Sequence, residues 1–153
     1  MNSATSPRNI LQGYVTNLEF GGLRIPVTIQ SMLIREYAAR NKFLFKLSVG
    51  EYAFPGCFLQ LEGLFPQLSD LEGIGMCSMF MLPKNSEIRH RIYERCISAG
   101  AALHLIIEGI VIREIKDVER VEEILSFHRC FKDSLTTIAS ELLPELPLPD
   151  CFT

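Results

Sequence analysis

The sequence predicts an α/β protein with three layers, in which helices cover a four-stranded, mainly parallel sheet. Short apolar runs alternate with longer amphipathic stretches, and glycine or proline stands at most of the boundaries between them. Strands and helices that alternate along a chain favour parallel pairing through right-handed crossovers. The 153 residues suit one domain, and the stretches after the last apolar run add C-terminal helices to it.

Apolar runs bounded by turn residues mark the four predicted strands, at residues 11–17, 43–48, 73–78 and 101–108. The run at 73–78 is nearly uncharged, as expected of a strand that is covered on both faces. Three helices are predicted between the strands, at residues 26–41, 58–65 and 83–100. The first helix should bury the stripe of Ile29, Met32, Leu33 and Tyr37, because these residues recur at helical spacing.

The rest of the chain is expected to add helices to this core. Gly109 should turn the chain away from the sheet, and amphipathic spacing predicts two further helices, at 115–127 and 130–142. The single domain 1–153 would then consist of an α/β core at 12–110, C-terminal helices within 111–142 and an extended tail at 143–153. The tail contains three of the eight prolines, which favour an extended course.

Composition excludes several classes of protein. Hydrophobic residues make up 48% of the chain and the net charge is −3, which argues against intrinsic disorder. Eighteen acidic residues against fifteen basic ones do not suit a nucleic-acid-binding module. No apolar run approaches the length of a membrane-spanning helix, and residues 1–8 lack the apolar segment of a signal peptide. A cytoplasmic protein without a nucleic-acid partner or a membrane span is therefore expected.

The cysteines and glycines predict neither a metal nor a cofactor. The five cysteines are odd in number and widely spaced, with no Cys-x-x-Cys pair, so reduced thiols are expected. No glycine-rich phosphate-binding motif is present, which argues against a dinucleotide or nucleoside triphosphate site. His104 lies inside an apolar run and is expected in the core or at an interface, while His90 lies on a charged helix face and His128 ends a helix.

Two stretches, Thr28 to Asn41 and Gly73 to Met79, resemble the catalytic domain of the serine recombinases, the family of resolvases and invertases. The resemblance covers roughly residues 12–110 and implies a flavodoxin-like core of four strands. The family places a nucleophilic serine and an arginine just after the first strand, where this chain has Thr16, Asn17 and Leu18. Its arginine pair after the third strand is also missing. Strand exchange needs these groups, so recombinase activity is not expected.

Residues 26–41, 50–57 and 74–83 resemble a second family, the bacterial sporadic carbohydrate cluster proteins. Members of this family are found beside enzymes that make surface polysaccharides. The resemblance implies a pathway rather than a reaction, because no activity defines the family.

Ligands of open parallel sheets bind outside the carboxyl ends of the strands. That rule selects polar residues that follow the predicted strands, together with Cys57 at the start of the second helix: they are Asn17, Glu51, Tyr52, Ser78 and Glu108. Glu51, Cys57 and Ser78 are the catalytic candidates, and Asn17, Tyr52, Glu108 and Arg89 are the ligand-binding candidates.

Each candidate has both a functional and a structural interpretation. Glu51 and Glu108 follow apolar runs that could raise a carboxyl pKa for acid–base work, but each could instead cap a helix or pair with a base. Cys57 could be a thiolate favoured by a helix N-terminus, or a buried structural thiol. Ser78 stands where a nucleophile could stand, without a visible activating pair.

The last two candidates are open in the same way. Tyr52 could hydrogen-bond a ligand or simply pack against the sheet edge. Arg89 belongs to a basic helix that could bind the diphosphate of a nucleotide sugar, or could lie on a solvated helix face.

Two functions follow from these observations. The first is binding of a sugar or an activated sugar at the strand ends, in bacterial surface-carbohydrate biosynthesis; whether the chain catalyses a reaction stays open. The second is a noncatalytic module that docks onto a pathway enzyme or forms a homo-oligomer through the C-terminal helices.

Overall fold

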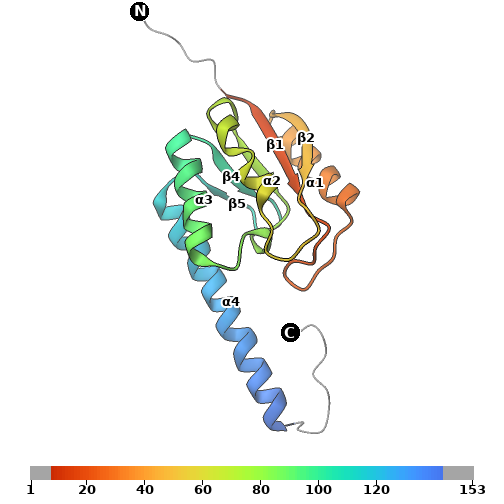
Figure 1. The fold of residues 1–153 in the computed structure, drawn as a ribbon, viewed down its shortest axis with the longest axis vertical. Helices are drawn as coiled ribbons and strands as arrows, with labels where there is room; N and C mark the ends of the chain where they lie inside the picture. Colours follow the sequence, from red (N-terminus) through yellow and green to blue (C-terminus); the bar gives the residue numbers. More distant parts are fainter. Residues whose placement is uncertain (1–7, 143–153) are drawn as a thin grey trace, which may run out of the picture. The chain divides into compact units, whose positions relative to one another are not determined.

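The computed structural model describes residues 8–142, and the predicted tail at 143–153 lies outside the described residues (Figure 1). The chain divides into two compact units, one that ends at Asp117 and one that starts at Val118. The strands are β1 (Ile10–Val15), β2 (Leu44–Gly50), β3 (Gly73–Met76), β4 (Ala102–Leu105) and β5 (Ile110–Ile112). The helices are α1 (Val27–Arg40), α2 (Leu59–Glu62), α3 (Ser86–Ala99) and α4 (Ile115–Leu142), with 3₁₀ helices η1 (Phe65–Asp70) and η2 (Met79–Met81).

The five strands form one sheet in the order β2-β1-β3-β4-β5. β1 pairs in parallel with both β2 and β3, and β3 pairs in parallel with β4, as the alternation of elements predicts. With right-handed crossovers, this order places α1 on one face of the sheet and α2 and α3 on the other. The mainly parallel α/β core is therefore confirmed.

The sheet has one strand more than the sequence analysis predicts. Gly109 adopts a left-handed φ of 66°, and the chain turns back after it into β5, which pairs antiparallel with β4. A run of three residues is too short to show the alternation that identifies a strand, so β5 is recognisable only through its pairing.

α1 buries a different face from the one predicted. Gln30, Ile34 and Ala38 are buried, whereas Met32 is 62% exposed and Ile29 is 44% exposed. Gly75 of β3 explains the choice, because a side chain there would lie 3.1 Å from the Ile34 side chain. The small residue on the sheet admits Ile34 at close range and rotates the helix away from its more apolar stripe.

α4 is one continuous helix of 28 residues, where the sequence analysis predicts two shorter helices. No proline or glycine occurs between Ile115 and Leu142, so nothing in this segment interrupts the backbone hydrogen bonds. Within residues 8–142, no helix is both long enough and apolar enough to cross a membrane.

Candidate functional site

The carboxylate of Glu51 is buried just after β2, where it accepts hydrogen bonds from a hydroxyl, a thiol and several backbone N–H groups. The Tyr14 hydroxyl donates to it at 3.0 Å, and the backbone N–H groups of Gln60 and Leu61 donate at 3.1 and 3.2 Å. The backbone N–H of Tyr52 and the Cys57 thiol also donate to Oε1, at 3.1 and 3.6 Å. Glu51 is therefore the anion that satisfies the first amides of α2.

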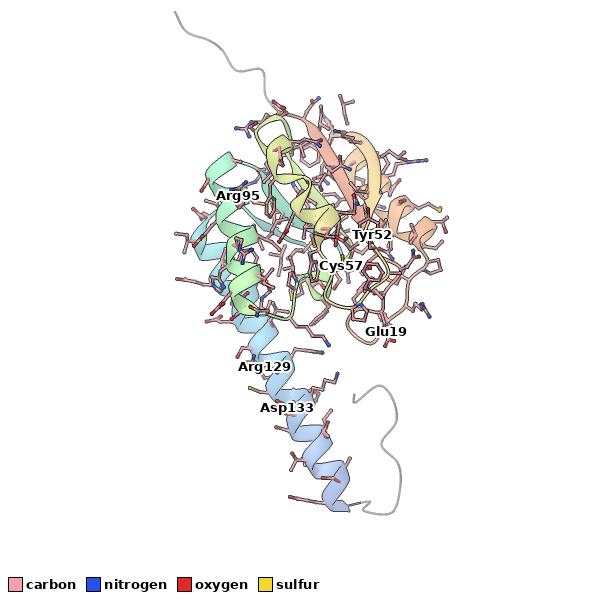
Figure 2. The ribbon with its side chains drawn as sticks, in the orientation of Figure 1. Glu19, Tyr52, Cys57, Arg95, Arg129 and Asp133 are labelled. Carbon is pink, nitrogen blue, oxygen red and sulfur yellow. The ribbon has the colours of Figure 1, made fainter. Side chains whose placement is uncertain are left out.

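This arrangement favours the structural interpretation of both Glu51 and Cys57. The position at the start of α2 that could stabilise a Cys57 thiolate is occupied by the Glu51 carboxylate, and the thiol serves it as a donor. Burial and the adjacent Glu51 charge raise the pKa of the Tyr14 hydroxyl, which keeps Tyr14 protonated as a donor. Figure 2 shows Cys57 and Tyr52 on the segment that joins β2 to α2.

The Tyr52 side chain stays on the surface. It is 48% exposed and stacks on Phe54, whose side chain is 61% exposed, with 6.1 Å between the ring centroids. Two exposed rings on one loop can pack against an apolar partner or ligand. Tyr52 as a ligand-binding residue stays a prediction.

The structure pairs Ser78 with Glu108, two candidates from different strand ends. The Ser78 hydroxyl donates to Glu108 Oε1 at 2.5 Å, and the Met79 N–H donates to Glu108 Oε2 at 3.1 Å. Ser78 Oγ also accepts from Phe80 N–H, so it caps η2. The pair closes the loop after β3, as the capping interpretation of Glu108 expects, and no hydrogen bond links it to Glu51.

Asn17 and Arg89 do not join either cluster. Asn17 is exposed after β1. Arg89 is 8% exposed rather than on a solvated outer face, and its guanidinium donates to the carbonyls of Pro83 and Lys84 at 3.0 and 2.7 Å. These bonds hold the segment that leads into α3, which corrects the expectation of a basic outer face at this position.

Gln30 holds the loop after β1. Its Oε1 accepts from Thr16 N–H at 3.1 Å, and its Nε2 donates to the carbonyls of Thr16 and Ile25, both at 2.7 Å. The sequence analysis misses Gln30, because a polar residue in a helix is ordinarily expected on the solvent side.

A second feature that the sequence does not reveal is an open cavity of about 290 Å³ beside β2. Its lining includes Gln12 and Ser48 from the strand side and Gln60 and Gln67 from α2 and η1, with Lys46 as its one charged residue. These residues lie far apart along the chain and form no motif, so only the folded chain brings them together.

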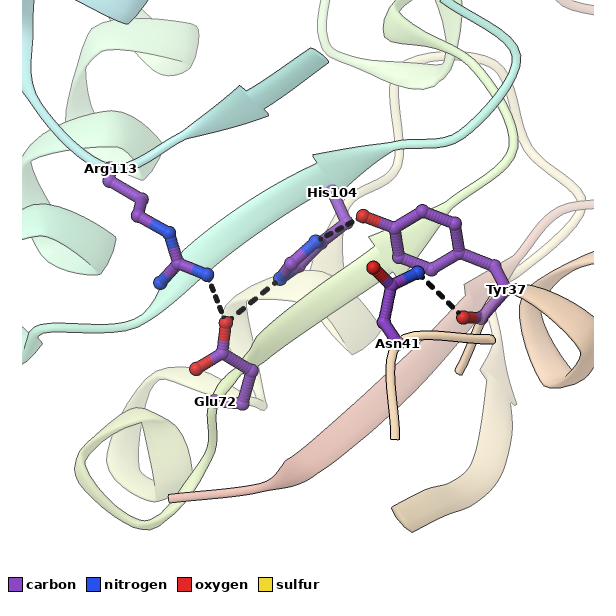
Figure 3. A network of polar contacts seen from close by, with 5 residues as sticks. All are labelled: Tyr37, Asn41, Glu72, His104 and Arg113. Carbon is purple, nitrogen blue, oxygen red and sulfur yellow. Dashed lines mark hydrogen bonds and ion pairs between the residues drawn. The ribbon is translucent and has the colours of Figure 1, made fainter. Parts of the chain in front are cut away.

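A polar network around His104 lies between α1 and the strands (Figure 3). His104 Nδ1 is 2.8 Å from the Tyr37 hydroxyl, and Nε2 is 3.3 Å from Oε1 of Glu72, a contact at ion-pair distance without hydrogen-bond geometry. Arg113 pairs with the same Glu72 oxygen. Burial lowers the pKa of His104 to about 4, so the imidazole is neutral. Its Nδ1 can therefore accept a hydrogen bond from the Tyr37 hydroxyl, as the core interpretation of His104 predicts.

The structure is similar to the crystal structure of the N-terminal catalytic domain of TP901-1 integrase. The two share 13% sequence identity with a TM-score of 0.60, and the match covers 82% of this chain and 98% of the integrase chain. This similarity confirms the resolvase-like fold. No family model and no curated protein matches the sequence. The fold is therefore shared with an integrase catalytic domain, and a shared fold does not by itself assign an activity.

Proposed function

We propose that this chain is a noncatalytic interaction module that associates with a second copy of itself through α4. The observation that supports the proposal is an exposed apolar stripe on this helix. Phe127 is 72% exposed and Phe131 is 54% exposed, and their rings stack with 6.3 Å between centroids. Ile124 and Ile138 extend the stripe in both directions and are 37% and 50% exposed. Contiguous exposed apolar side chains of this size mark protein–protein contact sites.

The spacing of the stripe suits a helical partner. Leu135 and Ile138 follow Ile124 and Phe127 at an interval of eleven residues. An eleven-residue repeat corresponds to about 3.67 residues per turn, close to the 3.6 of a straight helix. The stripe therefore stays on one side of α4 over several turns, which is what lengthwise contact between two helices requires.

A second copy of the chain is the partner that this stripe fits best. Symmetric dimers bury the same patch on both subunits, so an apolar stripe meets an identical one. Charged residues of both signs accompany the stripe, for example Arg129 and Asp133 (Figure 2), so no oppositely charged partner is needed.

The proposal that the module is noncatalytic rests on the hydrogen bonds made by the catalytic candidates Glu51 and Ser78. The Glu51 carboxylate is fully engaged in holding α2, and Ser78 is engaged with Glu108. These bonds support a structural role for both residues.

Sedimentation of the full chain tests this function. The wild type should sediment as a dimer at micromolar concentration, and the double variant F127S/F131S should be a folded monomer, because serine removes the apolar contact area. Phe54→Ser, which changes an equally exposed phenylalanine on another surface, should leave the dimer intact. A monomeric wild type at these concentrations contradicts the proposal.

Membership in the sporadic carbohydrate cluster family, and with it a role in surface-polysaccharide synthesis in the cytoplasm, stays a prediction that rests on the resemblance alone. Sugar binding is likewise a prediction. The feature that supports it is the open cavity beside β2 rather than the strand ends, because the strand-end carboxylates are engaged with the protein itself.

A further inference from the structure

The cavity beside β2 has a buried amide as part of its wall. Gln12 is 2% exposed and belongs to β1, which β2 joins with an irregular register: Gln12 faces Lys46, but Tyr14 faces Val49. Gly13 between them has no side chain, and a Cβ there would lie 2.3 Å from Ser48 Oγ. The bulge in β2 is therefore possible only because residue 13 is glycine, and it opens the sheet edge beside Gln12.

The orientation of the Gln12 amide is fixed by two backbone acceptors. Nε2 donates to the carbonyl of Gly13 at 2.9 Å and to the carbonyl of Leu47 at 2.8 Å. The reverse orientation would set the amide oxygen against both carbonyl oxygens. The oxygen Oε1 therefore points away from these two carbonyls. Among residues 8–142, no donor bonds to Oε1, and this oxygen keeps some solvent contact, since in the same part of the chain only His104 Nε2 is a fully buried side-chain atom without a partner. A donor that enters through the cavity would satisfy it.

Lys46 supplies the positive charge of the cavity. Its side chain is exposed at the opening, and Nζ donates to Gln67 Oε1 at 3.0 Å. This contact uses one of the three ammonium protons. In the described part of the chain, Arg40, Arg91 and Arg113 each lie within ion-pair distance of a glutamate, whereas no carboxylate lies within 4.0 Å of Lys46. The charge of Lys46 is thus available to an anion.

Size and lining define the ligand further. A volume of about 290 Å³ is at the lower limit of small-molecule sites. It has room for one sugar ring but not for a ring together with a nucleotide. Gln60 adds an amide that can both donate and accept, which suits neighbouring hydroxyl groups of a ligand.

We propose that this cavity binds a single sugar ring that carries one anionic group, either a sugar phosphate or a sugar acid. A ring hydroxyl donates to Gln12 Oε1, and the anionic group lies against Lys46 at the opening. The site is separate from the stripe on α4, so it does not depend on self-association.

Calorimetric titration of the full chain at low salt tests the proposal with five probes: glucose, glucose 6-phosphate, glucuronate, inorganic phosphate and UDP-glucose. Glucose 6-phosphate or glucuronate should bind with a lower Kd than glucose, because only they reach both Gln12 and Lys46. Whichever of the two binds more tightly identifies the source of the anionic group. Inorganic phosphate and UDP-glucose should bind more weakly than the preferred sugar.

Two variants examine the two halves of the site. Lys46→Gln should raise the Kd of the anionic sugar about five-fold, the loss of one exposed ion pair, and leave the Kd of glucose unchanged. Gln60→Leu should weaken both sugars. Lys84→Gln is the matched control, because it removes the same charge from an exposed lysine outside the cavity and should change neither Kd.

Several outcomes overturn the proposal. One is a lack of saturable binding by any sugar while the protein remains folded. Another is equal affinity for glucose and for the anionic sugars. Inorganic phosphate that binds as tightly as glucose 6-phosphate would show an adventitious ion on Lys46, and preferred binding of UDP-glucose would show that the site takes a larger ligand.

Discussion

At the scale of single residues, the Glu51 carboxylate joins the end of β2 to the start of α2. It accepts from one tyrosine hydroxyl, one thiol and three backbone N–H groups, those of Tyr52, Gln60 and Leu61. Hydrogen bonds to an ionised acceptor are about twice as strong as neutral ones. The carboxylate thus contributes strongly to the local stability of the compact unit that ends at Asp117, because its loss would leave several buried donors without an acceptor.

Glu51→Gln should destabilise the protein by about 2–4 kcal/mol. The replacement keeps the shape but turns an amide NH₂ toward donors that need an acceptor. Urea denaturation followed by circular dichroism measures the change. Glu36→Gln, which removes the carboxylate of an exposed pair with Arg40, is the control and should cost no more than about 0.5 kcal/mol. Equal effects of the two variants would show that Glu51 does not hold α2.

The pKa of His104 predicts a dependence of stability on pH. Burial is the largest cause of its decrease from 6.5 to about 4; Glu72 acts to raise this pKa, and Arg113 acts to lower it. Unfolded His104 binds a proton below pH 6.5, whereas folded His104 does so only near pH 4. The free energy of unfolding should therefore decrease as the pH falls from about 6.5 to 4, by up to about 1.4 kcal/mol per pH unit, and level off below.

Urea denaturation at pH 7, 6 and 5 measures this decrease. His104→Gln, which keeps an acceptor for the Tyr37 hydroxyl without a titrating ring, should lose less stability over the same range than the wild type. His90→Gln alters an exposed histidine and should behave as the wild type does. Parallel curves for the wild type and His104→Gln would exclude His104 as the source.

At the scale of the elements, α1 shows how the sheet selects a helix face. The stripe of Ile29, Met32 and Leu33 has the right spacing for burial, yet all three side chains are exposed. The face that packs contains Gln30, because its amide satisfies the backbone of the loop after β1. Hydrophobic spacing identifies the helix, and polar bonds together with Gly75 decide its rotation.

The first turn of α1 offers a further prediction, because it contains no acidic residue and no side chain caps it. Thr28→Glu should stabilise the protein by about 0.3–1 kcal/mol, since a carboxylate near a helix N-terminus interacts favourably with the free amides. Thermal unfolding measures the shift. Thr28→Gln controls for helix propensity, and the difference between the two should shrink in high salt. A difference that persists in high salt would rule out an electrostatic origin.

Hydrophobic spacing misses β5 altogether and divides α4 into two helices. β5 is too short for its alternation to be seen, and it exists because β4 offers an edge to pair with. α4 is longer than predicted, because nothing between residues 127 and 130 ends the helix. The extent of β5 thus depends on pairing with a distant strand, whereas the extent of α4 follows from the absence of helix-breaking residues in its own segment.

At the scale of the whole molecule, the buried core and the proposed contact surface occupy different parts of the chain. Among the described residues, the buried apolar side chains all lie at or before Val121. The exposed stripe on α4 starts at Ile124. The core and the surface for association should therefore be separable by truncation.

A chain that ends at Leu125 should fold and unfold cooperatively, with a melting temperature within a few degrees of the full-length value. It should also be monomeric, because Ile124 is then all that is left of the stripe. Differential scanning calorimetry and sedimentation measure the two properties. A truncated chain without a cooperative transition would show that residues after Leu125 are needed for the core, in contrast to their exposure.

The sequence by itself determined the α/β class, the order of the first four strands and three helices, and the burial of His104, because hydrophobic spacing and turn residues are local signals. It also located Glu51, Ser78 and Glu108 at strand ends. Only the tertiary structure decided that Glu51 and Glu108 accept hydrogen bonds from the protein itself. It also decided which face of α1 is buried, and that Gln12 and Lys46 line the same cavity. These outcomes depend on which buried polar groups find partners across the sheet, and residues far apart along the chain supply those partners.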